Sequence, residues 1–444
     1  MKEIRFDSKN SLVSETELAS VLQQLRPEVE RMNEAAEKGY DDGRASINLP
    51  IDKGLARECT GLAKKKLAQR PEYLVVIGIG GSNLGSLAVQ EAVLGRQYNE
   101  CTKKIKVLFA DTVDPDCMAR IYALLASSMK KKKKVVVNAI SKSGSTTESI
   151  ANMEIIVGIL RQRSKGYQKQ VVITSDAGSR FSKFAEEKGF DVLKIPAKVG
   201  GRYSVFSPVG LFPLSVLGIS PKSLLDGAAL MRKRCLDKDL SKNPAAIAAA
   251  TSYIQYKKGK NIHDLFVFSP DLESLGKWYR QLLAESIGKE MDLQGNKVFT
   301  GPTPTVSIGS TDLHSMGQLY LGGPFDKYTT FLRVDEGKSR ISVPKMQEYS
   351  VLVDKIQGIA LKDMMDAIYD GTTLAYKKGS RPYSEIILPD KSPSSIAQFM
   401  QFKMFETIYL ASLLGVNPFD QPNVESYKIE TRRILAERQI RGSK

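Results

Sequence analysis

A dense run of hydroxyl side chains lies between Ser141 and Ser149, directly after the apolar stretch VVVNAI. In SKSGSTTES, six of nine residues carry a hydroxyl group, beside one lysine and one glycine. A phosphate group is bound by such a set of hydroxyls and backbone amides at the N-terminus of a helix. One or two hydroxyls would be enough to cap a helix, so the surplus predicts a phosphate site. An ordinary helix cap is the alternative interpretation.

A glycine-rich turn, IGIGGSNLG, precedes this run and contains Gly78, Gly80 and Gly81. Such a turn between a strand and a helix lets backbone N–H groups approach an anion closely. A dinucleotide-binding fold is the rival, with Asp111 as its ribose-binding acid. The G-x-G-x-x-G spacing would require glycine at position 83, where Asn83 stands, so a sugar or phosphate loop fits better. A purely structural glycine turn remains open.

Two further segments place a single charged side chain where it could act on a reacting carbon. In VGGRYS, paired glycines free the backbone to hold Arg202 away from solvent, where its charge would stabilise a developing enediolate oxygen. In LGKWYRQLLAES, Gln281 and Glu285 are four residues apart and therefore project from one helix face. A single carboxylate can move a proton between adjacent carbons. A surface arginine, a salt-bridged glutamate, or Glu290 in place of Glu285 are the alternatives.

The chain contains only two histidines, His263 and His314. His314 lies among polar turn residues, and its imidazole can titrate near neutral pH, so it suits a proton shuttle oriented by Asp312 or another carboxylate. Two histidines and four irregularly spaced cysteines provide neither a histidine-rich metal site nor a disulfide framework. We therefore expect chemistry without metal or organic cofactor, in a reducing compartment.

Lysine and arginine exceed aspartate and glutamate by 65 to 49, which gives a net charge of +16. A basic surface attracts anions, from nucleic acids to phosphorylated metabolites. The densest run, Lys130–Lys134, has no interleaved aromatic residues and is interpreted as a solvated turn, with nucleic-acid binding as a minor alternative. The N-terminus resembles no signal peptide, and the uncharged stretch from Tyr203 up to Lys222 contains prolines and glycines typical of a buried segment. We expect a cytoplasmic protein that binds neither nucleic acid nor membrane.

The candidate site residues lie in a chain that alternates continuous apolar runs with segments of helical length. Such runs are typical of parallel strands covered on both faces, and they predict a doubly wound α/β fold. The predicted strands are Tyr73–Ile79, Lys106–Ala110, Lys134–Ile140, Gln170–Thr174, Asp191–Ile195, His263–Pro270, Thr303–Gly309, Tyr328–Val334 and Ser384–Pro389. The predicted helices include Glu15–Lys38, Ser274–Ile287, Lys355–Lys378, Pro393–Leu414 and a C-terminal amphipathic helix from Val424 to about Ile440.

Five blocks in order make the chain similar to the glucose-6-phosphate isomerase family, a fold of two sugar isomerase (SIS) domains. The blocks are GIGGSNLG, SKSGSTTES, VGGRYS, QLLAES with TDLHSMGQ, and FDQPNVESYK, and the match runs over most of the chain. The resemblance implies two doubly wound α/β domains with parallel sheets. We divide the chain into a helical segment (1–55), a phosphate-binding SIS domain (56–225), a second SIS domain (226–414) and a helical arm (415–444).

The resemblance also implies roles for individual residues. Glu285 is the proton-transfer carboxylate, Arg202 lies beside the reacting carbons, and His314 and Lys428 serve ring opening. His314 comes from the neighbouring subunit, so a homodimer with shared sites is implied. The residues implied to bind substrate are Gly81, Ser82, Ser141, Lys142, Ser143, Thr146, Gln281 and Gln421.

The activity implied is the reversible conversion of glucose 6-phosphate to fructose 6-phosphate through a cis-enediol, in glycolysis and gluconeogenesis. Three alternatives stay open at this point. The first is a non-catalytic SIS-type regulator that binds sugar phosphates, the second is an isomerase that also accepts mannose 6-phosphate, and the third is an NAD-dependent dehydrogenase.

Overall fold

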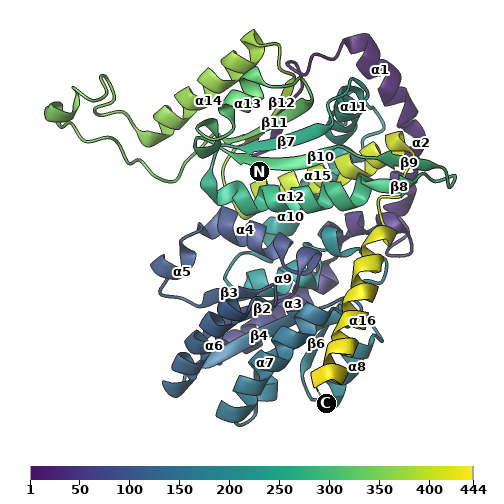
Figure 1. The fold of residues 1–444 in the computed structure, drawn as a ribbon, viewed down its shortest axis with the longest axis vertical. Coiled ribbons are helices and arrows are strands. Elements are labelled where there is room, and N and C mark those ends of the chain that lie inside the picture. Colours follow the sequence, from purple (N-terminus) through teal and green to yellow (C-terminus); the bar gives the residue numbers. More distant parts are fainter. Residues whose placement is uncertain (1, 443–444) are drawn as a thin grey trace.

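The computed structural model describes residues 2–442, and its architecture is built on two five-stranded sheets (Figure 1). The first sheet is parallel throughout and has the order β3-β2-β4-β5-β6. Its strands are β2 (Pro71–Ile77), β3 (Lys106–Ala110), β4 (Lys134–Ile140), β5 (Val171–Asp176) and β6 (Asp191–Ile195). Its helices are α3 (Lys53–Leu67), α4 (Leu84–Leu94), α5 (Tyr98–Cys101), α6 (Pro115–Lys130), α7 (Thr147–Arg163), α8 (Arg180–Glu187) and α9 (Pro208–Val216).

The second sheet has the order β1-β12-β11-β7-β10. Four strands are parallel, and β1 pairs antiparallel with β12 at one edge. The strands are β1 (Arg5–Asp7), β7 (Ile262–Val267), β10 (Thr303–Ile308), β11 (Lys327–Val334) and β12 (Tyr383–Leu388). The helices of this half are α10 (Pro221–Cys235), α11 (Pro244–Lys257), α12 (Glu273–Ile287), α13 (Gly317–Gly322), α14 (Leu361–Lys378) and α15 (Pro393–Leu414).

The two sheets share one winding plan. If the parallel strands of each sheet are numbered in chain order, the first sheet reads 2-1-3-4-5 and the second reads 2-1-3-4, with β1 in the fifth position. This plan is the doubly wound pattern that the apolar runs predict, and all nine predicted strands are present.

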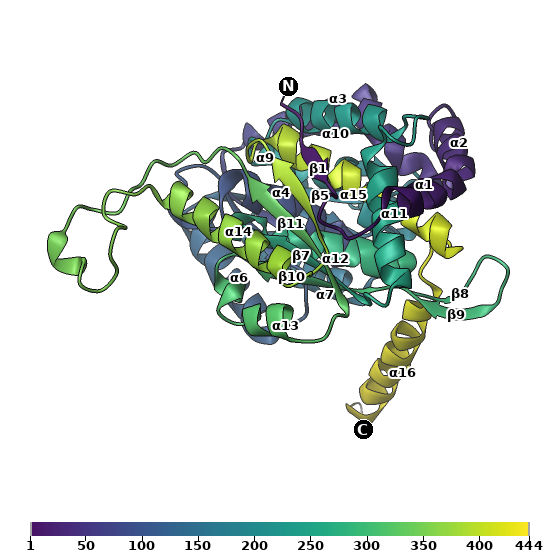
Figure 2. The same cartoon turned by 90° about the horizontal axis from the view of Figure 1, so that it is seen from above.

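One apolar core lies between the two sheets. Leu74 and Val76 of β2 face the same cluster as Leu265 of β7, together with the buried helices α12 and α15. The outer face of the first sheet packs on α6 and α7, and an aromatic cluster joins the second sheet to α13 and α14 (Figures 1 and 2). Because both sheets contribute to a continuous core, the division at residues 55, 225 and 414 remains a prediction.

Several predicted elements differ in detail from the structure. The single helix expected over 15–38 is wrong: α1 (Glu15–Gln24) and α2 (Arg26–Ala35) meet at Leu25, and Pro27 stands at the start of the second helix. The helix expected from Lys355 begins at Leu361, and the N-terminal segment contributes the strand β1 as well as helices. A hairpin of β8 (Lys289–Met291) and β9 (Lys297–Thr300) follows α12 and was not predicted.

The C-terminal arm is present as α16 (Glu425–Gly442), which projects from the rest of the chain in Figure 2. Within residues 2–442, the helices are all too short or too polar to cross a bilayer.

The contact between α10 and α15 depends on the absence of a side chain at Gly227, where an added Cβ would lie 2.3 Å from the carbonyl oxygen of Ser394. We expect Gly227→Ala to lower the free energy of unfolding by about 1–3 kcal/mol, because two backbones must separate. Gly158, inside α7, has no atom within 4 Å of an added Cβ. Gly158→Ala is the matched control and should be neutral or stabilising by up to about 1 kcal/mol. Urea unfolding of both variants measures the difference, and equal effects would contradict the packing argument.

Candidate active site

The candidate site begins where the first sheet reverses its winding. β2 and β4 are neighbours, but the chain continues from β2 to β3 on one side and from β4 to β5 on the other. Ligands of open α/β sheets bind in the crevice that opens at this switch point, beyond the carboxyl ends of the strands. The glycine turn follows β2 and the hydroxyl run follows β4. An added Cβ at Gly78 would lie 3.2 Å from the carbonyl oxygen of Ile140, so the glycine turn lies against the end of β4, directly before the hydroxyl loop.

The hydroxyl loop 141–146 is ordered by its own side chains. The Ser141 and Thr146 hydroxyls are 3.1 Å apart, and the backbone N–H of Gly144 donates to the Ser141 hydroxyl. The Ser143 and Ser145 hydroxyls are 2.8 Å apart and exposed to solvent. The loop therefore presents hydroxyls at the crevice while a buried serine holds its shape.

Thr146 is the N-cap residue of α7, yet its side chain makes no capping hydrogen bond. The first N–H groups of this 17-residue helix are therefore not satisfied by the cap side chain. This observation weighs against the interpretation of the hydroxyl run as a helix cap, and it leaves the positive end of the helix dipole open to an anion.

Lys142 belongs to the hydroxyl loop but is directed toward another segment. Its Nζ donates to the carbonyl oxygens of Ala197 and Val199 at 2.9 and 3.0 Å. Asp176 Oδ2 lies 3.9 Å from the same Nζ. Burial raises the pKa of Asp176 to about 6, although the Lys142 charge opposes this shift. In this arrangement Lys142 ties the hydroxyl loop to the segment that leads into Gly200.

Two glycine contacts connect the glycine turn to the rest of the site. A Cβ added at Gly81 would lie 2.3 Å from the carbonyl carbon of Gly201, so the two backbones touch. Gly80 has a φ of +58°, and an added Cβ there would lie 2.9 Å from Nε2 of Gln281. Ser82 belongs to the same turn. Glycine is thus required where the first sheet's loop meets both VGGRYS and α12.

Asn83 and Asp111 are joined by a hydrogen bond of 3.2 Å from the amide nitrogen to the carboxylate. Asp111 is the residue that a dinucleotide-binding interpretation would assign to a ribose hydroxyl. Its carboxylate is instead bonded to the residue that replaces the third glycine of that motif, which weighs further against the dehydrogenase alternative.

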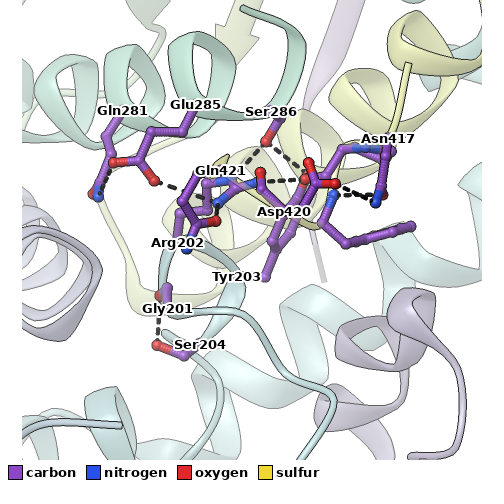
Figure 3. Close-up of polar contacts among 12 residues, drawn as sticks. Gly201, Arg202, Tyr203, Ser204, Gln281, Glu285, Ser286, Asn417, Asp420 and Gln421 are labelled. Atoms are coloured by element: carbon purple, nitrogen blue, oxygen red, sulfur yellow. Dashed lines mark hydrogen bonds and ion pairs between the residues drawn. The ribbon is translucent and has the colours of Figure 1, made fainter. Parts of the chain in front are cut away.

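Arg202 is buried, with its side chain only 3% exposed, and it lies at the centre of the polar network in Figure 3. A buried guanidinium group is tolerated when its N–H groups have acceptors. Each of the five N–H groups has one: Ser286 Oγ for Nε, Glu285 Oε2 and Gln421 Oε1 for Nη1, and the carbonyl oxygens of Pro418 and Asp420 for Nη2. The alternative of an ordinary surface arginine is wrong.

Glu285 and Gln281 point to the same side of α12, as the helical spacing predicts (Figure 3). Gln281 Nε2 donates to Glu285 Oε1 at 3.0 Å, while Arg202 Nη1 approaches Glu285 Oε2 at 3.3 Å. The Glu285 side chain is 34% exposed. One carboxylate is thus fixed by two donors and remains partly accessible to solvent.

His314 lies apart from this network. Gly301, just before β10, is close to the carbonyl of Ile287 at the end of α12, whereas Gly309, just after β10, packs on Phe268. His314 follows this second end and is exposed. The six-residue strand spans about 20 Å, and His314 and Glu285 lie toward opposite ends of it within one chain.

Asp312 does not orient His314, contrary to our expectation. Its carboxylate accepts from the backbone N–H of Ile308 and from the hydroxyl of Ser315, both at 2.7 Å. The Asp312 carboxylate therefore fixes the backbone of the turn that follows β10.

Lys428 and Glu290 also lie outside the Arg202 network. Lys428 Nζ pairs with Glu425 in the first turn of α16. Glu290 lies beyond the end of α12 and bonds Lys297 and Asn423, so it does not replace Glu285 in this structure.

Sequence reasoning missed three residues that complete the network. Ser286 accepts from Arg202 and lies 2.9 Å from the Tyr203 hydroxyl, and Asp420 and Lys289 fix the segment that carries Gln421. The only signal in the sequence is adjacency, because each of the three lies within four residues of Glu285 or Gln421.

Known proteins resemble this chain over the part that contains the glycine turn, the hydroxyl loop, Arg202 and Glu285. A family model described as phosphoglucose isomerase matches residues 53–324. The chain is 35% identical to the glucose-6-phosphate isomerase of Carboxydothermus hydrogenoformans, over 84% of this chain and 80% of that protein. It is 32% identical to the glucose-6-phosphate isomerase of Rubrobacter xylanophilus, over 96% of this chain and 97% of that protein.

Solved structures agree on the fold. A hypothetical protein from Thermus thermophilus, 28% identical, superimposes with a TM-score of 0.83 over 98% of this chain and 100% of that one. A glucose-6-phosphate isomerase from Chlamydia trachomatis, 19% identical, gives the same TM-score over 99% of this chain and 89% of that one.

The exposed hydroxyls of the loop give a direct test of anion binding. We expect Ser143→Ala combined with Thr146→Ala to raise the dissociation constant of inorganic phosphate about tenfold or more, because charge-assisted hydrogen bonds are lost. Isothermal titration calorimetry measures the constant. Ser127→Ala, an exposed serine on α6, is the control and should bind phosphate as the parent chain does. An unchanged constant in the double variant would remove the loop from anion binding.

Proposed function

The chain belongs to the phosphoglucose isomerase family, and from that premise we propose how its residues interconvert glucose 6-phosphate and fructose 6-phosphate. The activity is an aldose–ketose isomerisation. One observation carries the assignment of the site. The Glu285 carboxylate is held by Gln281 and Arg202, and Gln281 also touches the glycine turn, which lies against the end of β4 directly before the hydroxyl loop.

The phosphate group of the substrate binds at the hydroxyl loop. Ser141, Ser143 and Thr146 supply hydroxyls, and the N-terminus of α7 supplies backbone N–H groups. Lys142 adds a positive charge near the loop and fixes its position through Ala197 and Val199. With the phosphate held there, the sugar extends past Gly81 and Ser82 toward α12.

Proton transfer takes place at Glu285. The carboxylate removes the proton from C2 of the open-chain aldose and returns it to C1. The intermediate between these two steps is a cis-enediolate. Arg202 stabilises the negative oxygen of this intermediate with a charge that is already in place before the reaction. Gln281 and Gln421 bind sugar hydroxyls beside it. Because both carbons exchange oxidation state within one molecule, the proposed route requires neither a metal nor an organic cofactor.

Ring opening precedes proton transfer, and His314 and Lys428 serve this step. The ring oxygen needs a proton donor and the anomeric hydroxyl needs an acceptor, and the two nitrogens of a neutral imidazole supply one of each. Lys428 follows Gln421 by seven residues, on the arm that begins at Glu425. This nearness in sequence to Gln421 supports the proposed role of Lys428.

The functional unit we propose is a homodimer in which His314 reaches the site of the partner subunit. Support comes from the position of His314 at the opposite end of β10 from Glu285. An extended apolar segment gives further support: Val351, Leu352 and Val353 are 85%, 75% and 54% exposed on the loop before α14, which projects from the body in Figures 1 and 2. Exposed apolar patches of this kind mark protein interfaces.

Cytoplasmic action in glycolysis and gluconeogenesis is also part of the proposal. All four cysteines are free thiols, a state that persists in a reducing compartment. A sugar-phosphate regulator would need the hydroxyl loop but no carboxylate aligned with a buried arginine. Activity on mannose 6-phosphate has no specific support in the geometry.

Replacement of the proposed proton-transfer group tests the mechanism. Glu285→Gln removes the base but keeps an oxygen to accept from Arg202, and its NH₂ group can donate to Gln281 once the Gln281 amide has flipped. We therefore expect kcat to fall about 10²–10⁴-fold with little change in KM. A coupled assay with glucose 6-phosphate measures both constants. Glu290→Gln is the matched control and should retain parental turnover. Near-parental turnover of Glu285→Gln would exclude this carboxylate.

Mixed dimers test the origin of His314. Two inactive variants, Glu285→Gln and His314→Ala, are coexpressed with different affinity tags, and the heterodimer is isolated. If His314 crosses the interface, one of the heterodimer's two sites contains both parental residues, so turnover should recover to about half of the parental dimer. If both residues act within one chain, every site carries a defect and the heterodimer stays inactive.

A further inference from the structure

Lys289 is a buried lysine at the end of α12, and its side chain is 5% exposed. Its Nζ has three acceptors, which match the three N–H groups of an ammonium. They are the backbone carbonyl of Glu285 at 2.8 Å, the backbone carbonyl of Asp420 at 2.6 Å and Asp420 Oδ1 at 3.0 Å. Lys289 thus joins the carbonyl of the proposed proton-transfer residue to a segment 131 residues further along the chain.

Two side chains, those of Lys289 and Arg202, bond segment 417–421 from outside. The carbonyl oxygen of Asp420 accepts from both Lys289 and Arg202, and that of Pro418 also accepts from Arg202. A fourth bond is local: Asn417 Nδ2 donates to Asp420 Oδ2 at 2.8 Å. Gln421, which accepts from Arg202, is the next residue (Figure 3).

A helix-capping role does not explain this arrangement. A lysine at a helix C-terminus commonly bonds a free carbonyl and interacts with the helix dipole, and the bond to Glu285 has this character. Two of the three bonds, however, go to Asp420. A cap would leave the ammonium exposed to water, whereas Lys289 is buried and so needs an anionic partner.

We propose that the Lys289–Asp420 pair is a positioning element for the reaction, which holds segment 417–421 so that Arg202 and Gln421 keep their alignment with Glu285. This inference rests on the proposed function. Lys289 and Asp420 touch no reacting atom. They act through the backbone carbonyl of Asp420, which accepts from both Lys289 and Arg202. If this carbonyl moved, one N–H group of Arg202 would lose its acceptor.

The charges of the pair fit this role. Burial lowers the pKa of Lys289, and the bond to Asp420 opposes this shift. The Asp420 carboxylate is half exposed and balances the ammonium, so the positive charge beside the reacting carbons is that of Arg202. The alignment of the site is thereby set by a neutral pair rather than by an extra cation.

Lys289→Met tests the proposal, since methionine preserves much of the side-chain volume but donates no hydrogen bond. We expect kcat to fall about tenfold or more, because small misalignments of reacting groups are costly, while KM for fructose 6-phosphate changes less than about twofold. Lys289→Arg should restore part of kcat. A double-mutant cycle with Asp420→Asn should be non-additive, with the double variant close to Lys289→Met alone.

Three parallel measurements separate the possible failures. Lys297→Met, an exposed lysine of β9 in the same hairpin, is the control and should keep parental constants. Thermal unfolding of each variant shows whether it still folds. If Lys289→Met does not fold, the kcat of Asp420→Asn is the test of the pair. Glu285→Gln in the same assay reports on the proposed function. If Glu285→Gln is inactive and Lys289→Met retains parental kcat, or if the two substitutions are additive, the positioning role is refuted while the proposed function stands.

Discussion

The constraint on which the site depends is the burial of the Arg202 guanidinium group. A charged group with five N–H donors is stable inside a protein only when each donor meets an acceptor. Here the acceptors come from the end of α12 and from segment 417–421. Three parts of the chain must therefore converge on one side chain, and the carboxylate of Glu285 is placed by the same bonds.

Close backbone contacts make this convergence possible. Gly81 and Gly201 bring the glycine turn against the loop that carries Arg202, and Gly80 admits the side chain of Gln281. A methyl group at Gly80 or at Gly81 would meet another atom at less than 3 Å. The glycine turn at the switch point of the first sheet thus touches the C-terminal half of α12, a helix that packs on the second sheet.

The shared core explains why a site can lie between the two halves. Both sheets present apolar faces to the same buried helices, so α12 is fixed on one side by the second sheet and on the other by α4 and the glycine turn. The same fold places His314 beyond the opposite end of β10. Distance along a six-residue strand, rather than flexibility, separates it from Glu285 within a chain.

The sequence by itself determined the strands, the helix face and the loops that carry the chemistry. Continuous apolar runs specify buried parallel strands, and a four-residue spacing places Gln281 and Glu285 together, because both signals are local. The break at Leu25, the edge strand β1 and the β8–β9 hairpin escaped prediction, since each depends on a partner that is distant in sequence or on a short, weak pattern. Only the tertiary structure decided that Arg202 bonds Pro418 and Asp420, that Lys289 joins them, and that Asp312 does not hold His314. Such contacts join residues up to 218 positions apart, and no periodicity in a chain encodes which distant carbonyl will meet a buried cation.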